Sequence, residues 1–188
     1  MSNRDSPGYF ISGDFMDSKN TSCGIRAAEF AVTDQESMLQ KIREIARRNE
    51  THIVCFDAEK LAGCRHAETA IRLAERSFFH GTPISNSFEM EALLYASGSR
   101  QCNAAVSFGL HEGANTAYVC CCPDKEAVWK DLAQIMHFTG DFPRDITPEK
   151  SSRLMELFGI TAEELEAAGH DRLAELVLER VALLEVYK

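Results

Sequence analysis

Residues 84–110, ISNSFEMEALLYASGSRQCNAAVSFGL, contain two helical patterns separated by a glycine. The first pattern has apolar residues spaced as one helix face: Met90, Leu93 and Leu94. Gly98 is the residue type that ends a helix in the left-handed conformation. Asn86 is placed to cap the first helix, and Ser99 is placed to cap the second. We therefore expect two short helices that meet at Gly98.

Arg100 is the unusual residue of this stretch. A second helix that begins at Ser99 places Arg100 in its first turn, where the partial positive charge of the helix start disfavours a cation by about 0.3–1 kcal/mol. Free N–H groups at a helix start bind anions, and an arginine there adds a charge-assisted contact to a phosphate. Arg100 therefore either binds an anion or extends outward to solvent or to a nearby acid, and the sequence leaves both readings open.

Strand patterns lie on both sides of this stretch. Residues 8–16 and 24–33 alternate and carry β-branched or aromatic residues, and 52–56 (HIVCF) has the length of a buried strand. Residues 116–122 (TAYVCCC) form a further strand pattern. Because strands and helices follow each other in mixed order, the sequence predicts an α+β fold with a mixed, largely antiparallel sheet flanked by helices.

Helical patterns connect these strands. Residues 33–36 (TDQE) form a capping box with Thr33 as the cap, which opens a helix that ends near Arg48. Residues 65–78 are Ala-rich with one small-residue stripe, and Pro123-Asp124 begins another helix.

The chain divides into an α+β core domain, residues 1–146, and a helical C-terminal extension, residues 147–188, packed on it. The extension follows the loop-like segment 140–144 (GDFPR) and is marked by residues that start or end helices: Thr147, Pro148, Gly159, Thr161 and Asp171. The last helix has one apolar stripe: Leu173, Leu176, Val177, Val181 and Leu184.

Composition limits the class of protein. The 188 residues are 45% hydrophobic and 26% charged, which fits a globular protein with a sizeable core. No stretch approaches the roughly 18 apolar residues of a membrane helix, and the first residues are polar. We expect a cytoplasmic protein with no membrane partner.

Charge is distributed unevenly along the chain. The net charge is −9, but residues 60–110 carry five Lys/Arg and four Asp/Glu, a balance of +1. Residues 111–188 carry eight basic and fifteen acidic residues, a balance of −7. A polyanionic partner is therefore expected to approach the middle segment.

The sequence contains no Gly-rich phosphate loop, nucleophile elbow or HExxH motif. Cys120, Cys121 and Cys122 lie on one predicted strand, so their side chains alternate between its two faces and cannot all bind one ion. Glu89 and Glu91 are two residues apart on a helix and point in different directions. We therefore expect no enzyme activity, cofactor or metal, and the seven cysteines act mainly as small apolar residues.

Residues 84–110, preceded by the Ala-rich helix 65–78 and followed by the closing ERVALLEV (179–186), resemble the small non-catalytic subunit of the KEOPS complex. This is the PRPK-binding protein (TPRKB) family, and the tail is similar to its archaeal members. The resemblance covers most of the chain from about residue 24. It implies an α/β fold without an active site, binding to the atypical kinase/ATPase subunit of KEOPS, and binding to the single-stranded 3′ CCA end of tRNA. It also implies a role in threonylcarbamoyladenosine modification of tRNA.

Under this resemblance we expect the chain to activate the kinase by docking and to contact tRNA through polar and basic residues of the middle segment: Lys60, Arg65, Asn86, Ser99, Arg100 and Gln101. Two other classes stay open. One is a small metal- or thiol-using enzyme built on the cysteines, and the other is a structural module that self-associates through its C-terminal helix.

Overall fold

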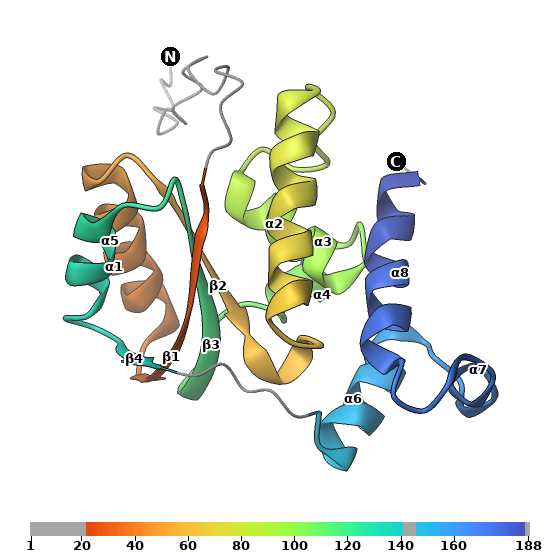
Figure 1. Cartoon of the computed structure of the whole chain (residues 1–188). Helices are drawn as coiled ribbons and strands as arrows, with labels where there is room; N and C mark the ends of the chain where they lie inside the picture. The colour runs from red at the N-terminus through yellow and green to blue at the C-terminus, as the bar shows by residue number, and fades with distance from the viewer. Residues whose placement is uncertain (1–21, 141–145, 187–188) are drawn as a thin grey trace, which may run out of the picture.

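The computed structural model describes residues 22–140 and 146–186, and Figure 1 shows their arrangement. Within these ranges, four strands form one antiparallel sheet in the order β2-β3-β1-β4. Their bounds are Gly24–Val32 (β1), His52–Asp57 (β2), Gly113–Cys122 (β3) and His137–Thr139 (β4). The strand predicted at 8–16 and most of the predicted 140–144 loop lie outside the described residues. The antiparallel sheet and its flanking helices confirm the predicted α+β class.

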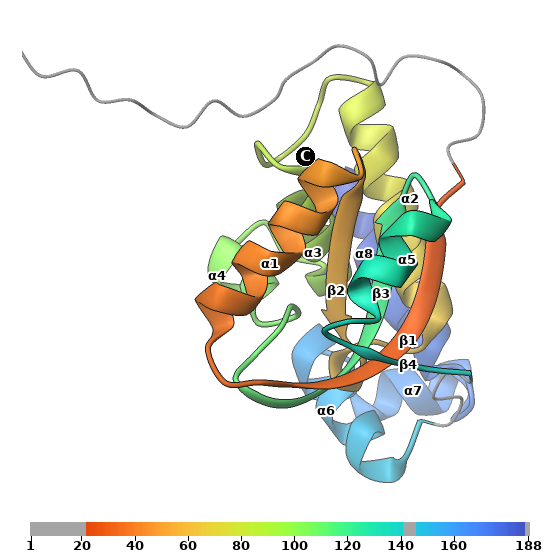
Figure 2. The same cartoon turned by 90° about the vertical axis from the view of Figure 1, so that its left-hand side faces the viewer.

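Helices α1 (Gln35–Arg48) and α5 (Glu126–Leu132) cover one face of the sheet, which faces the viewer in Figure 2. Their apolar side chains form one core cluster with the strands: Met38, Ile42, Ile45, Val128, Trp129 and Leu132. Burial of this apolar surface holds the two helices on the sheet.

The opposite face carries the larger helical layer (Figure 1). Its helices are α2 (Cys64–Phe79), α3 (Phe88–Ser97), α4 (Cys102–Val106), α6 (Pro148–Phe158), α7 (Ala162–Ala168) and α8 (Leu173–Val186), with the 3₁₀ turn η1 (Ala58–Lys60). The predicted stripe of α8 is confirmed, since Val177 and Val181 are fully buried in this layer's cluster with Phe56 of β2. Residues from both sides of the predicted 146/147 boundary therefore share one core, and the division into two domains remains a prediction.

Strand β3 contributes to both core clusters. Cys120 and Cys122 belong to the cluster under α2, whereas Cys121 belongs to the cluster under α1 and α5. The prediction that consecutive cysteines alternate between the faces is therefore confirmed. In the described residues, every helix is too short or too polar to cross a membrane.

Several helices begin one or more residues away from the predicted cap. Asp34, not Thr33, caps α1 by accepting from Ser37 N, and Ser87, not Asn86, caps α3 by accepting from Met90 N. In each pair both residues are of capping type, and the one that adopts extended backbone directly before the first helical turn is the cap. The prediction of a helix start at Pro123 was also wrong, because α5 begins at Glu126.

Glu91 fixes the loop between α2 and α3. Its fully buried carboxylate accepts from Ser77 Oγ (2.8 Å), Ile84 N (2.9 Å) and Ser85 N (2.8 Å). Glu89 instead lies 2.8 Å from His52 Nδ1. The two carboxylates face different surroundings, as predicted, and Glu91 has a structural role.

Candidate functional site

The turn after α3 is built by Gly98. Its backbone is left-handed (φ 60°), which glycine adopts without the strain of a side chain. Gly98 N donates to Tyr95 O (3.0 Å) and Ser99 N donates to Leu94 O (3.2 Å). These two bonds form a Schellman motif, and they confirm the left-handed helix end that was predicted at Gly98.

Arg100 does not lie in a helix. Helix α4 begins at Cys102, and Gln101 precedes it without a side-chain cap. Ser99 Oγ accepts from Gln101 N (3.1 Å), so the serine closes a local turn and does not cap a helix. The prediction that Ser99 caps the second helix was therefore wrong. Arg100 consequently bears no cost from a helix dipole, and the N–H groups of a helix start do not provide an anion site at Arg100.

A pocket of about 310 Å³ opens beside this turn. Its walls come from the turn itself, from the end of α6 and from α8: residues 97–99, Leu157, Phe158, Arg180, Leu183 and Leu184. The volume lies near the lower end of small-ligand pockets, which span roughly 300–1,000 Å³. Ser99 is the predicted site residue that lines it, and Arg100 and Gln101 follow directly in the chain. The contributions of α6 and α8 were missed, because helical periodicity does not show where distant helices pack.

Arg180 is the cation of the pocket wall. Its Nη2 donates to both carboxylate oxygens of Glu164, at 2.6 and 2.8 Å. This ion pair, in which one nitrogen contacts both oxygens, joins α8 to α7 and partly offsets the positive charge at the pocket. Glu164 N donates to Thr161 Oγ1 (3.1 Å), so the predicted cap of α7 is confirmed.

His66 ties the start of α2 to the end of α3. Its Nε2 lies 2.9 Å from Ala96 O, and its Nδ1 accepts from Ala62 N at 3.2 Å. Burial lowers the pKa of His66 to about 4, so the ring is neutral at pH 7 and donates through Nε2. The clamp holds the first turn of α2, which contains Arg65, beside the end of α3.

Arg65 has the helix-start position that was predicted for Arg100. It is exposed in the first turn of α2, whose N-cap is Gly63, with no side-chain cap and no acid in the first turn. Among the described residues, no carboxylate forms an ion pair with Arg65. The cation is therefore unfavourable for α2 itself and is presented to solvent.

The other two predicted contact residues have different settings. Lys60 Nζ donates to Ser107 O at the end of α4 and lies 3.4 Å from Asp57 Oδ2. The positive charge of Lys60 is therefore partly neutralised by the Asp57 carboxylate. Asn86 precedes α3 whereas Ser99 follows it, and ten helical residues span about 15 Å. The structure therefore brings Arg65, Ser99, Arg100 and Gln101 to one region but leaves Asn86 away from it.

Most aromatic residues of the middle segment are core residues. Phe88 and Tyr95 are buried, whereas Phe79 at the end of α2 is 52% exposed. Val186 at the end of α8 is 73% exposed. The two helix ends are joined by the Arg76–Glu185 pair at 3.1 Å, so Phe79 and Val186 flank one ion pair. We call this surface the α2–α8 end.

Among the free cysteines, Cys55 is buried and Cys64 is half-buried. Burial raises the pKa of Cys55 to about 12, and burial with the neighbouring Glu68 raises that of Cys64 to about 11. These groups remain thiols at pH 7 and are poor nucleophiles. Cys23 and Cys122 form a disulfide, so these two of the seven cysteines depart from the expected role of small apolar residues. Their pairing follows from the β1–β3 register, in which Gly24 faces Cys121.

Fold and site together define a small α+β protein with an open pocket that has Arg180 in its wall, and with exposed apolar side chains at the ends of α2 and α8. The chain belongs to the CGI-121 family, whose model is described as kinase binding protein CGI-121 and matches residues 30–185. The regulatory protein Cgi121 of Methanocaldococcus jannaschii is 32% identical over 134 residues, which cover 71% of this chain and 83% of that protein. Both matches confirm the predicted family and its archaeal type.

Proposed function

We propose that the chain is a non-catalytic accessory protein that binds and regulates the atypical kinase/ATPase subunit of the KEOPS complex. The observation that carries this proposal is the family match over residues 30–185, which spans nearly the whole described fold. The high pKa of the Cys55 and Cys64 thiols also disfavours these two groups as nucleophiles of a thiol-based enzyme. The buried stripe of α8 disfavours self-association through that helix, because Val177 and Val181 already pack inside the chain.

The α2–α8 end is our choice for the kinase contact. Exposed aromatic and aliphatic side chains that surround a polar pair resemble the centre of a protein interface, where buried anchors carry most of the binding energy. Phe79 and Val186 are such anchors, and the Arg76–Glu185 pair holds their helices in place.

Size-exclusion chromatography of the purified chain with the purified kinase subunit tests the proposal. We expect a one-to-one complex at micromolar concentration and a change in the ATPase rate of the kinase. Separate elution at these concentrations, with no change in the rate, would contradict it.

We also propose that the pocket region binds the 3′ single-stranded end of tRNA. The support is a pocket of about 310 Å³ with both apolar and polar walls, lined by Ser99 and Arg180, with Arg100 directly following Ser99 in the chain. Unpaired bases at RNA ends stack on apolar or guanidinium surfaces while cations hold the phosphates. The net charge of −9 confines such contact to a local surface.

Titration of fluorescent tRNA with the chain tests this second proposal. Intact tRNA is compared with tRNA from which the CCA end has been removed. We expect the trimmed tRNA to bind at least tenfold more weakly, since base stacking contributes about 1–3 kcal/mol per base. Equal affinity for both RNAs would remove the 3′ end as the ligand.

A further inference from the structure

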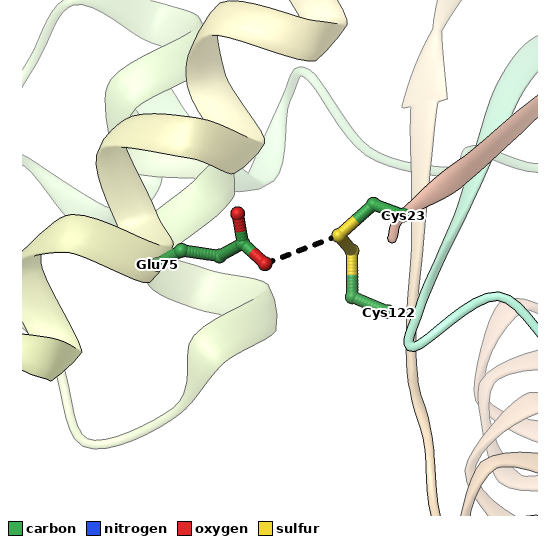
Figure 3. A group of neighbouring side chains, drawn as sticks. All are labelled: Cys23, Glu75 and Cys122. Carbon is green, nitrogen blue, oxygen red and sulfur yellow. Dashed lines mark hydrogen bonds between the residues drawn. A yellow bond between two sulfur atoms is a disulfide. The ribbon is translucent and has the colours of Figure 1, made fainter. Parts of the chain in front are cut away.

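Cys23, Cys122 and Glu75 converge at one corner of the sheet (Figure 3). Cys23 directly precedes β1, Cys122 ends β3, and Glu75 extends from α2 toward both sulfurs. One ligand atom from each residue lies within 4.8 Å of the other two. The residue before β1, the last residue of β3 and a residue of α2 therefore place two sulfurs and a carboxylate oxygen around one point.

The position of Glu75 is not explained by a disulfide. Its Oε1 lies 3.2 Å from the Cys23 sulfur, and a disulfide sulfur has no proton to donate. Within the described part of the chain, no Lys, Arg or His pairs with this half-buried carboxylate. A Cys23 thiol would donate a hydrogen bond to the Glu75 carboxylate. A cation bound to the cysteine thiolates would instead neutralise the negative charge of that carboxylate.

We propose that the reduced form of this corner is a zinc site with Cys23, Cys122 and Glu75 as its protein ligands. Zinc binds cysteine sulfur at about 2.3 Å and carboxylate oxygen at about 2.0–2.2 Å in tetrahedral geometry. Ligand atoms around one such ion lie roughly 3.6–3.8 Å apart. Separation of the two sulfurs after reduction brings all three atoms to this spacing, and Cys23 and Glu75 are sufficiently exposed to leave the fourth position for water.

The chemistry balances with a dithiol as the reductant. The dithiol transfers two electrons and two protons to the Cys23–Cys122 bond, which yields two thiols and the oxidised reductant. Zinc then displaces both thiol protons into solvent as it binds the two thiolates. Thiolate ligands favour zinc over hard cations such as magnesium and calcium, which prefer oxygen.

Cobalt(II) titration of the full chain tests the site, because cobalt takes tetrahedral thiolate positions and reports them by a sulfur-to-metal charge-transfer band. We expect the reduced protein to bind about one equivalent of cobalt with this band, and zinc to displace it. The oxidised protein shows no band. Thiol titration of the denatured protein is expected to give five free thiols before reduction and seven after it, from the described disulfide and the cysteine count.

Variants separate this site from other thiols. We expect Cys23→Ser to abolish the charge-transfer band. Glu75→Gln keeps the size of the half-buried side chain and should weaken binding at least about tenfold. Cys64→Ser is the matched control. The Cys64 sulfur lies 3.6 Å from a carboxylate oxygen of Glu68, but this pair lacks the second cysteine that Cys122 provides at the proposed site. It should bind cobalt as the native chain does.

The proposal is overturned if the reduced native chain shows no band, if the band survives Cys23→Ser, or if Glu75→Gln binds as tightly as the native chain. Loss of the band in Cys64→Ser would also overturn it, since cobalt would then occupy a different site. Far-ultraviolet circular dichroism confirms that each variant is folded. Kinase and tRNA binding are not needed for any of these measurements.

Discussion

His66 lies buried between α2 and α3, where its ring bonds both to Ala62 N and to Ala96 O. Protonation would place a second proton on Nδ1, which is the acceptor for Ala62, and a charge in the core. The aromatic rings of Phe158 and His66 also contact each other, at 5.6 Å between centroids. The neutral ring therefore holds together the elements that border the pocket.

This arrangement predicts acid sensitivity. Burial lowers the pKa of His66 from 6.5 to about 4, so between these values the unfolded chain binds a proton that the folded chain excludes. The free energy of unfolding contributed by His66 is complete above pH 6.5 and falls with pH, by about 2 kcal/mol by pH 5. Urea unfolding at both pH values measures this change.

His66→Gln is the control, since its amide can make both hydrogen bonds without titrating. The difference in unfolding free energy between the native chain and this variant should shrink as the pH falls. A difference that stays constant from pH 7 to pH 5 would contradict the role of His66.

Arg65 and Arg100 carry the electrostatic part of the proposed RNA contact. Either Arg65→Glu or Arg100→Glu should weaken tRNA binding at least about tenfold, because a charge-assisted hydrogen bond contributes about 1.5–3 kcal/mol. The salt dependence of binding should also decrease by about one phosphate contact. Fluorescence titration at several salt concentrations measures both effects.

Arg65→Glu has a further signature: it should stabilise the chain by about 0.3–1 kcal/mol, since it places an acid at the start of α2. Arg47→Glu on α1, across the sheet, is the charge-matched control and should bind tRNA nearly as the native chain does. Equal losses in all three variants would indicate a nonspecific charge effect and would remove the local site.

At the scale of elements, the cap residues decide where α3 begins. Ser87→Ala should destabilise the chain by about 1 kcal/mol, because it removes the acceptor for Met90 N. Asn86→Ala should change stability by less than about 0.5 kcal/mol. Thermal and urea unfolding compare the two variants, and the reverse order of effects would show that Asn86 is the cap.

The sequence predicts the positions of most helices and strands but not the cap residues at which the helices begin. Periodicity predicted α1, α2 and α8, because each helix buries one apolar face. Alternation or short apolar runs predicted the strands β1 to β3, and β2 and β3 are buried on both faces. It did not distinguish Asp34 from Thr33 or Ser87 from Asn86, since neighbouring residues share the capping chemistry and the backbone decides between them.

Contacts between distant elements were harder to predict. The pocket combines the Gly98 turn with α6 and α8, and the disulfide joins residues separated by 99 positions. Local patterns carry no information on which helices meet. The antiparallel pairing of β1 and β3 is the feature that would have placed Cys23 near Cys122, once its register was known.

At the scale of the whole molecule, the larger helical layer presents two separate features. The pocket lies at the Gly98 turn, and the α2–α8 end lies at Phe79 and Val186. Both depend on α8, which lines the pocket through Arg180 and carries Val186 at its end. The proposed kinase contact and the proposed RNA contact therefore lie on separate surfaces of the chain.

Variants of the α2–α8 end test this arrangement. Phe79→Asp and Val186→Asp place a charge where the proposed interface is apolar, so each should weaken kinase binding by more than about 1 kcal/mol. Val106→Asp is the matched control, because Val106 is 46% exposed on α4 and lies outside the α2–α8 end. All three changes are on exposed side chains and should leave the fold intact.

Isothermal titration calorimetry of the purified KEOPS kinase subunit with the native chain and these variants measures kinase binding at the α2–α8 end. We expect saturable one-to-one binding by the native chain and Val106→Asp, with a marked loss in Phe79→Asp and Val186→Asp. Absence of binding by the native chain would contradict the kinase-binding function, and undiminished binding by both end variants would contradict the α2–α8 end as the docking surface.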